Sequence, residues 1–440
     1  MLLRDPVHGL ITFEHDEEAI VRRLIETPEV QRLRHIRQLG LTSLAYPGAE
    51  HTRFAHALGA AHVMRLFIAR LRQLHEQLPF WQQLTSERAR DALAAALLHD
   101  IGHGPFSHLF EDVIRHGGFA TGAIARTHEA WTEAILMDKS TGVHQVLVDH
   151  DPELPQRVAG LIGGQHPMPY LARAVSGTFD VDRCDYLLRD AHATGVRYGA
   201  YDLPWLLRSL RFGVGHSERA PGLAIDGGKG LSAIESFILA RLFMFQQVYF
   251  HKATRAAEWM IRAIMQRVSQ LLRAGSRVSE VPPALAALAR GQLPSLGDYL
   301  NLDDTVLLCS MRRWCDVSDP TLSDLCQRLR ARALFKTHAL YGDDAEPAGR
   351  QRMLEIARDI ARVQRLDPEL YVALDVAHIA PYSDDSSLTV IFDDGRARRP
   401  AEVSFVLDRL RDETLTRVRL IFAAELRPAI TEALRANGNR

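Results

Sequence analysis

Histidine and aspartate are concentrated in the first half of this chain. Nine of its 20 histidines lie between His51 and His128. The densest group is the run Leu98-His99-Asp100-Ile101-Gly102-His103-Gly104-Pro105-Phe106-Ser107-His108. A hydrolytic metal site uses imidazole and carboxylate ligands to clamp a phosphate and to generate hydroxide at neutral pH. The run therefore predicts a metal site for phosphate chemistry, although a single His-Asp pair is more often a surface or helix-cap feature.

The end of one helix must bring these groups together. Residues 91–100 have a helical pattern in which the small Ala96 lies one turn before the His99-Asp100 pair. The helix then meets three breakers, Gly102, Gly104 and Pro105. The chain can turn back after them, so His103 and His108 are expected near the same place.

Two further segments contribute candidate groups. His56 belongs to a different helix, and on its own it would more often be a core or surface histidine than a ligand. A helix expected over residues 181–191 has a polar face that consists of Asp182, Tyr186, Arg189 and Asp190. Such a face is usually only solvated, but its groups also suit a pocket for metal and phosphate, so both interpretations stay open.

Composition narrows the class of protein. Lys and Arg total 53 and Asp and Glu total 54, so the chain lacks the basic excess that drives strong nucleic-acid binding. Apolar runs such as residues 92–98 are too short to span a bilayer, and the N-terminal residues show no signal-peptide pattern. We therefore expect a cytoplasmic protein without a membrane partner.

The cysteines suggest neither a disulfide framework nor a cysteine metal site. Cys184, Cys309, Cys315 and Cys326 show no C-x-x-C spacing, so buried free thiols are expected. Any metal must therefore use histidine and carboxylate ligands.

The expected fold is mainly α. We predict a helical core over residues 1–275, a helical extension over 276–345 and a small α+β region over 346–440, although one large helical body with an appendage fits the length equally well. The core should contain a short strand or hairpin at 7–13, a β-hairpin insertion at 212–230 and a long amphipathic helix at 231–272.

The C-terminal region has a different pattern. Linkers are expected at Pro282-Pro283 and at 341–349. A helix at 351–362, strands at 370–376 and 387–392 with a turn at 393–395, and a final helical segment at 403–434 should follow. We predict an assembly surface here.

Several motifs together resemble one known family. They are Asp5-Pro6-Val7-His8-Gly9; Thr27-Pro28, Gln31-Arg32-Leu33-Arg34 and Gln38-Leu39-Gly40; Arg53-Phe54-Ala55-His56 with Leu58-Gly59; the run 98–108; Thr127-His128-Glu129; Val181-Asp182-Arg183-Cys184-Asp185-Tyr186 with Arg189-Asp190; Tyr249-Phe250-His251-Lys252; and Leu334-Phe335-Lys336-Thr337-His338. In this order they resemble the HD-domain superfamily, in particular the deoxynucleotide triphosphate triphosphohydrolases related to the SAM-and-HD-domain proteins, including bacterial dNTPase- and dGTPase-like members.

The resemblance implies a set of metal ligands and a reaction. The implied ligands are His56, His99, Asp100 and Asp182, holding one or two divalent ions, for which Fe, Mn, Mg, Co and Zn are open. The implied reaction is hydrolysis of a deoxynucleoside triphosphate to the deoxynucleoside and inorganic triphosphate. His108 matches the general acid, Asp182 is counted with the catalytic residues, and His103 and His128 would contact phosphate or orient the nucleophile.

The resemblance also implies how the substrate is held. Arg53, Arg183 and Lys252 match basic positions for the triphosphate, with Tyr186 and Arg241 near them. Gln38, Leu39, Asp190 and Tyr249 match positions around the sugar and base, where a tyrosine ring could exclude a ribose 2′ hydroxyl. Arg183 replaces the family's usual lysine, so a planar guanidinium group stands where the family has a compact ammonium group.

The resemblance also raises the questions of whether a nucleotide activates the protein and whether the protein forms an oligomer. Relatives often take a nucleotide activator and form dimers or tetramers, so a homo-oligomer is expected. Gln31 and Arg34 match positions that read guanine, whereas Glu26 replaces the usual Asp. Two alternatives remain: an HD-type phosphatase or phosphodiesterase acting on another nucleotide, because the metal core does not choose among phosphoesters, and a nucleotide-sensing regulator with weak activity.

Overall fold

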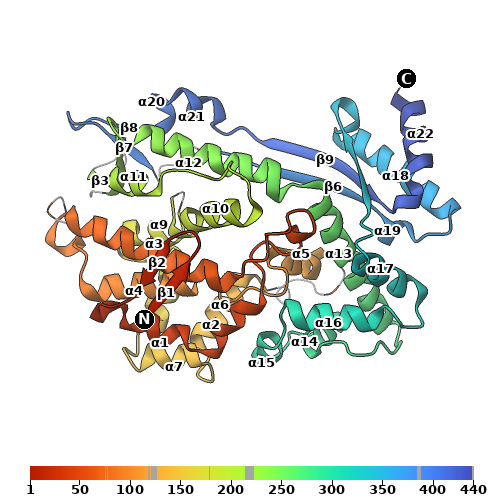
Figure 1. Ribbon diagram of the computed structural model, residues 1–440, viewed down its shortest axis with the longest axis horizontal. Helices are drawn as coiled ribbons and strands as arrows, with labels where there is room; N and C mark the ends of the chain where they lie inside the picture. Colours follow the sequence, from red (N-terminus) through yellow and green to blue (C-terminus); the bar gives the residue numbers. More distant parts are fainter. Residues whose placement is uncertain are drawn as a thin grey trace.

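A hairpin at the start of the chain lies against the helical body (Figure 1). The computed structural model describes residues 1–74, 76, 78–116, 119, 126–177, 179–213, 222–383 and 388–438. Strands β1 (Leu2–Asp5) and β2 (Gly9–Thr12) pair antiparallel, with Asp5 opposite Gly9. Gly9 has a φ of +73°, which a glycine adopts without strain. The strand or hairpin expected at 7–13 is confirmed as a strand, β2, which pairs with a first strand that lies before the expected range.

Three helices form the centre of the N-terminal half. Helix α3 (Arg53–Gln73) packs against both α4 (Ser86–Leu98) and α10 (Val181–Thr194). Ala57, Ala60 and Ala61 of α3 and the alanines of α4 are fully buried, so their small side chains allow the helix axes to approach closely. Around these three lie α1 (Ala19–Ile25), α2 (Pro28–Arg32), α5 (His108–His116), α6 (His128–Met137), α7 (Gly142–Val148), α8 (Leu154–Ile162), α9 (Pro169–Val175) and α11 (Leu203–Arg208). Short 3-10 turns occur at Asp16–Glu18, Leu33–His35, Thr42–Leu44 and Phe80–Gln82.

The long helix predicted over 231–272 is wrong in one respect, because it is two helices. Helix α12 (Leu231–Met244) passes into a π-helical turn, Phe245–Tyr249, and α13 (Lys252–Arg273) begins after a break at Phe250 and His251. A π turn inserts an extra residue into the helix, and such turns are frequent at functional sites. The apolar spacing continues through the break, so periodicity alone could not show it.

The helices after α13 surround a second hydrophobic core. They are α14 (Pro283–Ala289), α15 (Leu296–Leu300), α16 (Asp304–Trp314) and α17 (Pro320–Arg330). The C-terminal region adds α18 (Pro347–Val363), α19 (Pro368–Tyr371), α20 (Pro400–Val403), α21 (Phe405–Leu410) and α22 (Arg427–Gly438), with 3-10 turns at Gly342–Asp344 and Ala424–Leu426.

Two small sheets join segments that are far apart in sequence. The first has the order β3-β4-β7-β8, with β3 (Leu210–Gly213), β4 (Gly222–Asp226), β7 (Thr389–Ile391) and β8 (Ala397–Arg398). The second has the order β5-β9-β6, with β5 (Lys336–Leu340), β6 (Val372–Ile379) and β9 (Leu415–Phe422). The predicted hairpin β3–β4 is confirmed, but β4 also pairs in parallel with β7 from the C-terminal region. Residues 214–221, between its strands, lie outside the described residues.

The final helix predicted over 403–434 is also wrong. Its middle forms strand β9, the central strand of the second sheet. The pairing partners of β9 are 36 or more residues away along the chain, so local helical spacing gave no sign of them. Strands from different predicted domain ranges therefore share sheets. The division of the chain into domains at residues 275 and 345 stays a prediction.

The cysteines are free, as predicted, but one of them is not buried. Cys184, Cys315 and Cys326 are buried, whereas Cys309 is exposed on α16. Cys309 lies on the solvent side of that helix, so the prediction of burial was wrong for this residue.

Within the described part of the chain, one segment, Leu231–Tyr249, is long and apolar enough to cross a membrane by length and composition. This is weak evidence, because a core helix passes the same test. Ile234, Phe237, Ile238 and Val248 of this segment are buried in the hydrophobic core, as expected of a core helix. The cytoplasmic location stays a prediction.

A buried histidine pair under the hairpin predicts a specific acid sensitivity. Burial, together with the charges of His8 and Arg65, lowers the pKa of His62 from 6.5 to about 4, although Asp185 and Asp5 act in the opposite direction. The unfolded chain therefore binds a proton at His62 that the folded protein does not, so His62 removes stability as the pH falls from 6.5 to about 4. We expect the midpoint of thermal unfolding of His62→Gln to depend less on pH in this window. Equal pH slopes for the variant and the wild type would contradict this.

Candidate active site

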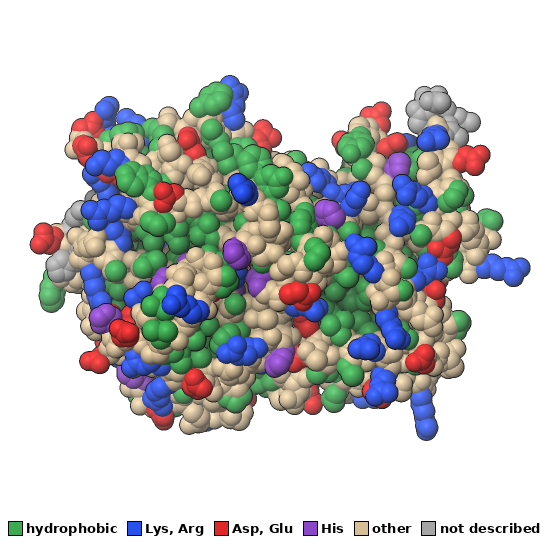
Figure 2. Space-filling model, in the orientation of Figure 1, with side chains coloured by type: hydrophobic (Ala, Val, Ile, Leu, Met, Phe, Trp, Pro, Cys, Tyr) green, Lys and Arg blue, Asp and Glu red, His purple; other side chains and the backbone are tan. Residues whose placement is uncertain are grey.

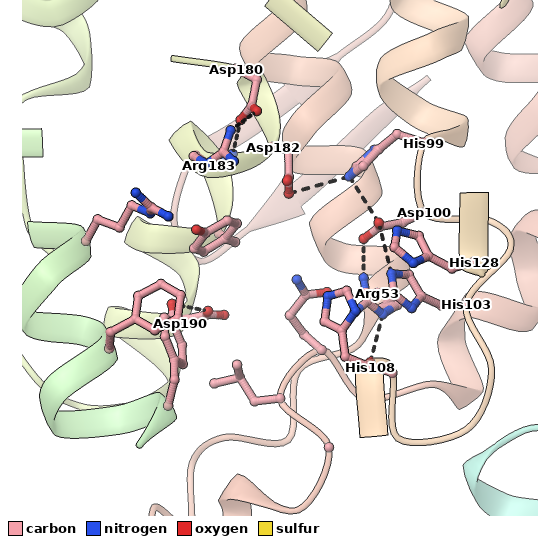
Figure 3. Close-up of a pocket in the computed structure, with 18 of the residues that line it drawn as sticks. Arg53, His99, Asp100, His103, His108, His128, Asp180, Asp182, Arg183 and Asp190 are labelled. Carbon is pink, nitrogen blue, oxygen red and sulfur yellow. Dashed lines mark hydrogen bonds and ion pairs between the residues drawn. The ribbon is translucent and has the colours of Figure 1, made fainter. Parts of the chain in front are cut away.

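Three side chains from three helices meet at one point. His56 lies on α3, His99 follows the last residue of α4, and Asp182 lies in the first turn of α10. His56 Nε2 is 3.0 Å from Asp182 Oδ1 and 3.3 Å from His99 Nε2, and His99 Nε2 is 3.5 Å from Asp182 Oδ1. Figure 3 shows His99 and Asp182 facing one another across this point. These three side chains form a group that could hold a metal ion.

The outer nitrogens of both imidazoles are already engaged. His56 Nδ1 is 2.8 Å from Asp185 Oδ2, and His99 Nδ1 is 2.9 Å from the carbonyl oxygen of Ala96. Carbonyl and carboxylate oxygens only accept hydrogen bonds, so each Nδ1 carries a proton and each Nε2 is directed to the shared point, where a bound cation would take the place of a proton. This is the donor arrangement that a divalent cation requires, and the residues therefore fit a metal.

The carboxylates make this point favourable for positive charge. Burial by itself lowers the pKa of His56, but the hydrogen bonds and charges of Asp182 and Asp185 outweigh it and raise the pKa to about 10. Burial would raise the pKa of Asp182, yet the two histidines hold it well below its usual range. Asp182 is therefore an anion at neutral pH.

Asp100 lies at the edge of the group. Its Oδ2 forms an ion pair with Arg53 Nη1 and is 3.6 Å from His56 Nε2. Its Oδ1 is 3.4 Å from His99 Nε2 and 3.3 Å from His103 Nε2. Asp100 therefore borders both the metal group and the neighbouring histidines, but an arginine already shares its charge.

A second cluster consists of His103, His108 and His128 around Glu111. The Oε1 atom of Glu111 is 2.8 Å from His128 Nδ1, 3.6 Å from His108 Nδ1 and 3.7 Å from His103 Nδ1. The His103 and His128 rings stack with centroids 4.0 Å apart. Sequence reasoning missed Glu111, although its position three residues after His108 on one helix was an available signal.

A strained turn directs His108 toward the cavity. Phe106 and Ser107 have φ values of 54° and 61°, which residues other than glycine seldom adopt. The turn is fixed because the Phe106 amide donates to Asp304 Oδ1 at 2.7 Å and the Ser107 hydroxyl donates to the Arg37 carbonyl at 3.0 Å. The helix-breaking residues predicted from the sequence, Gly102, Gly104 and Pro105, thus precede a turn that changes the direction of the chain where α5 begins.

The opposite side of the cavity carries a different set of groups. The Tyr249 hydroxyl donates to Asp190 Oδ2 at 2.7 Å, and His51 Nε2 is 2.8 Å from Asp190 Oδ1. Gln38 Oε1 is buried and has no hydrogen-bond partner within the described part of the chain. Arg183 forms an ion pair with Asp180. Figure 3 shows Arg183 and Asp190 across the cavity from His108 and His128.

A cavity of about 980 Å³ connects these groups. Most of the predicted site residues line it: Gln38, Leu39, Arg53, His99, Asp100, His103, His108, His128, Asp182, Arg183, Tyr186, Asp190, Arg241 and Tyr249. His56 lies behind this wall and is fully buried. Lys252 is exposed and does not line the cavity, nor do Glu26, Gln31 and Arg34.

The C-terminal region contributes to the same cavity, which the sequence did not predict. Residues 380–383 form part of its wall, and Arg241 Nη1 donates to the Pro381 carbonyl oxygen at 3.2 Å. The region predicted as an assembly surface therefore also shapes the site. The face in Figure 2 carries basic and acidic side chains intermixed, without a basic stripe suited to nucleic acid.

Comparison with known proteins decides the family. The HD domain family model matches residues 53–189, and the HD associated region matches residues 205–280. The uncharacterized protein YwfO of Bacillus subtilis is 36% identical over 87% of this chain and 80% of its own length. The chain belongs to the HD-domain superfamily. The HD domain contains His56, His99, Asp100 and Asp182.

Other relatives of this HD-domain protein indicate its chemistry. A phosphohydrolase from Bacteroides thetaiotaomicron has a similar structure, with a TM-score of 0.79, 28% identity and coverage of 96% of this chain and 99% of that one. The deoxynucleoside triphosphate triphosphohydrolase SAMHD1 of Danio rerio is 25% identical over 82% of this chain but only 59% of its own length. The chain is an HD-domain phosphohydrolase, and HD domains bind divalent metals.

Proposed function

We propose that this HD-domain phosphohydrolase converts deoxynucleoside triphosphates into deoxynucleosides and inorganic triphosphate. One observation carries the proposal: a metal-binding group, a histidine cluster and Arg53 lie on one side of a single cavity, and Arg183 and Asp190 lie on the other. The named activity of SAMHD1 relatives supports the same substrate class.

His56, His99, Asp100 and Asp182 would hold the divalent cation. When bound, such a cation neutralises phosphate charge and lowers the pKa of water from 15.7 toward about 7. Two imidazole nitrogens and carboxylate oxygens are ligands that Fe, Mn, Co and Zn accept, with Mg favouring the oxygens. The chain's own contribution is to fix these ligands on three helices that pack against one another.

His108 would donate the proton that the departing 5′ oxygen needs. It begins α5 at the cavity, and its side chain is 74% exposed, so a substrate can reach it. Burial would raise the pKa of Glu111, but the neighbouring His108 and His128 side chains hold it well below its usual range. The Glu111 carboxylate, 3.6 Å from His108 Nδ1, would attract that nitrogen and orient the ring toward the leaving oxygen.

His103 and His128 would contact the phosphate groups or orient the nucleophile. Burial, and the nearby positive charge of Arg53, hold the pKa of His103 well below its usual range, so this ring is neutral. A neutral imidazole can donate one hydrogen bond to a phosphate oxygen without carrying a second positive charge into the group.

The triphosphate would bind the basic residues of the cavity. Arg53 borders the metal group, and Arg183 lies across the cavity from it. Arg241 also lines the cavity, and both Arg183 and Arg241 act electrostatically on Tyr186. Planar guanidinium groups match phosphate oxygens in pairs. Arg183 would exchange its contact with Asp180 for phosphate when substrate binds. Lys252 lies outside the cavity, so we leave it out of this proposed role.

The deoxyribose would lie beside Tyr249. The hydrogen bond from its hydroxyl to Asp190 fixes the ring, and a fixed ring leaves little room for a 2′ hydroxyl. The buried Gln38 Oε1 could accept a hydrogen bond from the 3′ hydroxyl, and a substrate lacking that hydroxyl would leave the oxygen unpaired.

A nucleotide activator and a homo-oligomer remain part of the proposal. Gln31 and Arg34 lie together outside the cavity, with Arg34 Nε donating to Gln31 Oε1 at 2.7 Å. Arg34 also lies over the Phe54 ring at 3.6 Å. A regulatory nucleotide at this place would have to replace the contact between these two side chains, and Glu26 is exposed near them.

Product analysis tests the proposed reaction. Purified protein with Mn²⁺ is incubated with each dNTP, with and without GTP, and with the matching ribonucleotides as controls. We expect deoxynucleoside and intact triphosphate in equal amounts, and slower turnover of ribonucleotides because of the fixed Tyr249 ring. Stepwise release of orthophosphate, or hydrolysis only of monophosphates or cyclic nucleotides, would instead favour another HD phosphoesterase.

A further inference from the structure

A closed network of charged side chains lies behind His56, on the side away from the cavity. It joins Asp185 and Arg189 of α10 to Asp5 and His8 of the N-terminal hairpin. All four side chains are at most 8% exposed. We propose that this network holds the His56 ring in its ligating orientation and that the N-terminal hairpin is thus a working part of the metal centre. The inference rests on the metal site of the proposed function.

Asp185 is the centre of the network. Its Oδ1 accepts hydrogen bonds from His8 Nε2 at 2.6 Å and Arg189 Nη2 at 2.9 Å. Its Oδ2 accepts from His56 Nδ1 and Arg189 Nε, both at 2.8 Å. The carboxylate therefore has no freedom to rotate, and the direction of its bond to His56 is fixed. A metal-ligating histidine held in this way is pre-oriented and more basic.

The hairpin holds the far end of the network. Asp5 Oδ2 accepts from Arg189 Nη1 at 2.7 Å, and Asp5 Oδ1 accepts from the backbone amides of Val7 and His8, both at 2.9 Å. The turn between β1 and β2 is thereby tied to α10. His8, which lies in that turn, then reaches Asp185 directly. Two residues of the hairpin are needed to keep Asp185 and Arg189 in place.

Gly59 shows that α3 is built around this network. It lies three residues after His56 on the same helix, and a Cβ atom there would overlap Asp185 Oδ1 and Arg189 Nη2. Gly59 has helical neighbours on both sides, so no turn or positive φ requires a glycine at this position. The space is required by the Asp185–Arg189 pair.

The charges of the network favour a cation at His56. Asp185 pairs with Arg189 and places its carboxylate directly against Nδ1 of His56. The Nε2 lone pair on the opposite side of the ring is thereby made a stronger donor. Neutralising Asp185 would remove this effect without touching any ligand atom.

Mn²⁺ binding to the whole chain, measured without nucleotide, tests the inference. We expect Asp185→Asn and Asp5→Asn to raise the Mn²⁺ dissociation constant by about 10–100-fold, the usual effect of losing a partner of a metal ligand. His8→Gln should have a smaller effect in the same direction. Asp149→Asn is the matched control, because Asp149 lies in an exposed ion pair with Arg23 and should bind Mn²⁺ like the wild type.

The readouts separate positioning from stability. Circular dichroism and thermal unfolding without metal show whether each variant folds. If Asp185→Asn does not fold, the His8→Gln variant provides the test instead. Folded variants that bind Mn²⁺ as tightly as the wild type would overturn the inference. A wild-type protein that binds no Mn²⁺ would overturn the proposed metal site itself. Because no nucleotide is present, neither result depends on which phosphate compound the enzyme hydrolyses.

Discussion

Asp182→Ala is expected to abolish both metal retention and hydrolysis. Asp182 is the carboxylate of the metal group that has no arginine partner among the described residues, whereas Asp100 pairs with Arg53 and Asp185 with Arg189. Its negative charge is therefore the one most available to a cation. We expect kcat/KM to fall by more than the roughly 10²–10³-fold cost of removing one stabilising group from an active site.

Elemental analysis and single-turnover hydrolysis measure this result together. Asp182→Asn keeps the size of the side chain and removes its charge, so it should lose metal nearly as completely. Asp149→Asn again provides the control. If Asp182→Ala kept its metal and its rate, the ion would have to be held elsewhere, and the His103, His108, Glu111 and His128 group would be the next place to test.

His108→Ala is expected to slow hydrolysis by about 10²–10⁴-fold while metal content stays unchanged, since this is the usual contribution of a positioned general acid. His108 is not part of the His56, His99 and Asp182 group. The loss should lie in kcat, because the exposed ring adds little to binding of the ground state.

Glu111→Gln separates orientation from proton donation. The amide cannot fix the protonated Nδ1 of His108 as the carboxylate does, so we expect an intermediate loss of kcat with normal metal content. Should His108→Ala keep the wild-type rate and pH profile while His128→Ala does not, the proton would come from His128, which is 2.8 Å from the same carboxylate.

The run from His99 to His108 made the candidate site predictable from the sequence. Metal chemistry restricts ligands to a few residue types, and the breakers after Asp100 could only end the helix there. The predicted residues from Gln38 to Tyr249 meet in one cavity in the structure, with His56 behind its wall. Lys252 is the exception. The break before α13 places Tyr249 at the cavity and leaves Lys252 exposed in the next helical turn.

The sequence predicted local elements better than their partners. The β3–β4 hairpin and the helices around the metal group depend on nearby glycines, prolines and apolar spacing, and they form where expected. Strand β9 was mistaken for helix because its stability comes from β5 and β6, which lie far away along the chain. A strand whose two neighbours are both distant leaves little local signal.

The sequence by itself therefore determined which residue types do the chemistry and that a helix end presents them. Only the tertiary structure decided how they are charged and held. It assigned Arg53 to Asp100, left Asp182 without an arginine partner among the residues that the structure describes, and placed Glu111 among three histidines. It also set Asp185 between His56 and a hairpin 177 residues away. The physical reason is that pKa, orientation and metal affinity depend on which groups touch in space, and those contacts join segments that no local pattern connects.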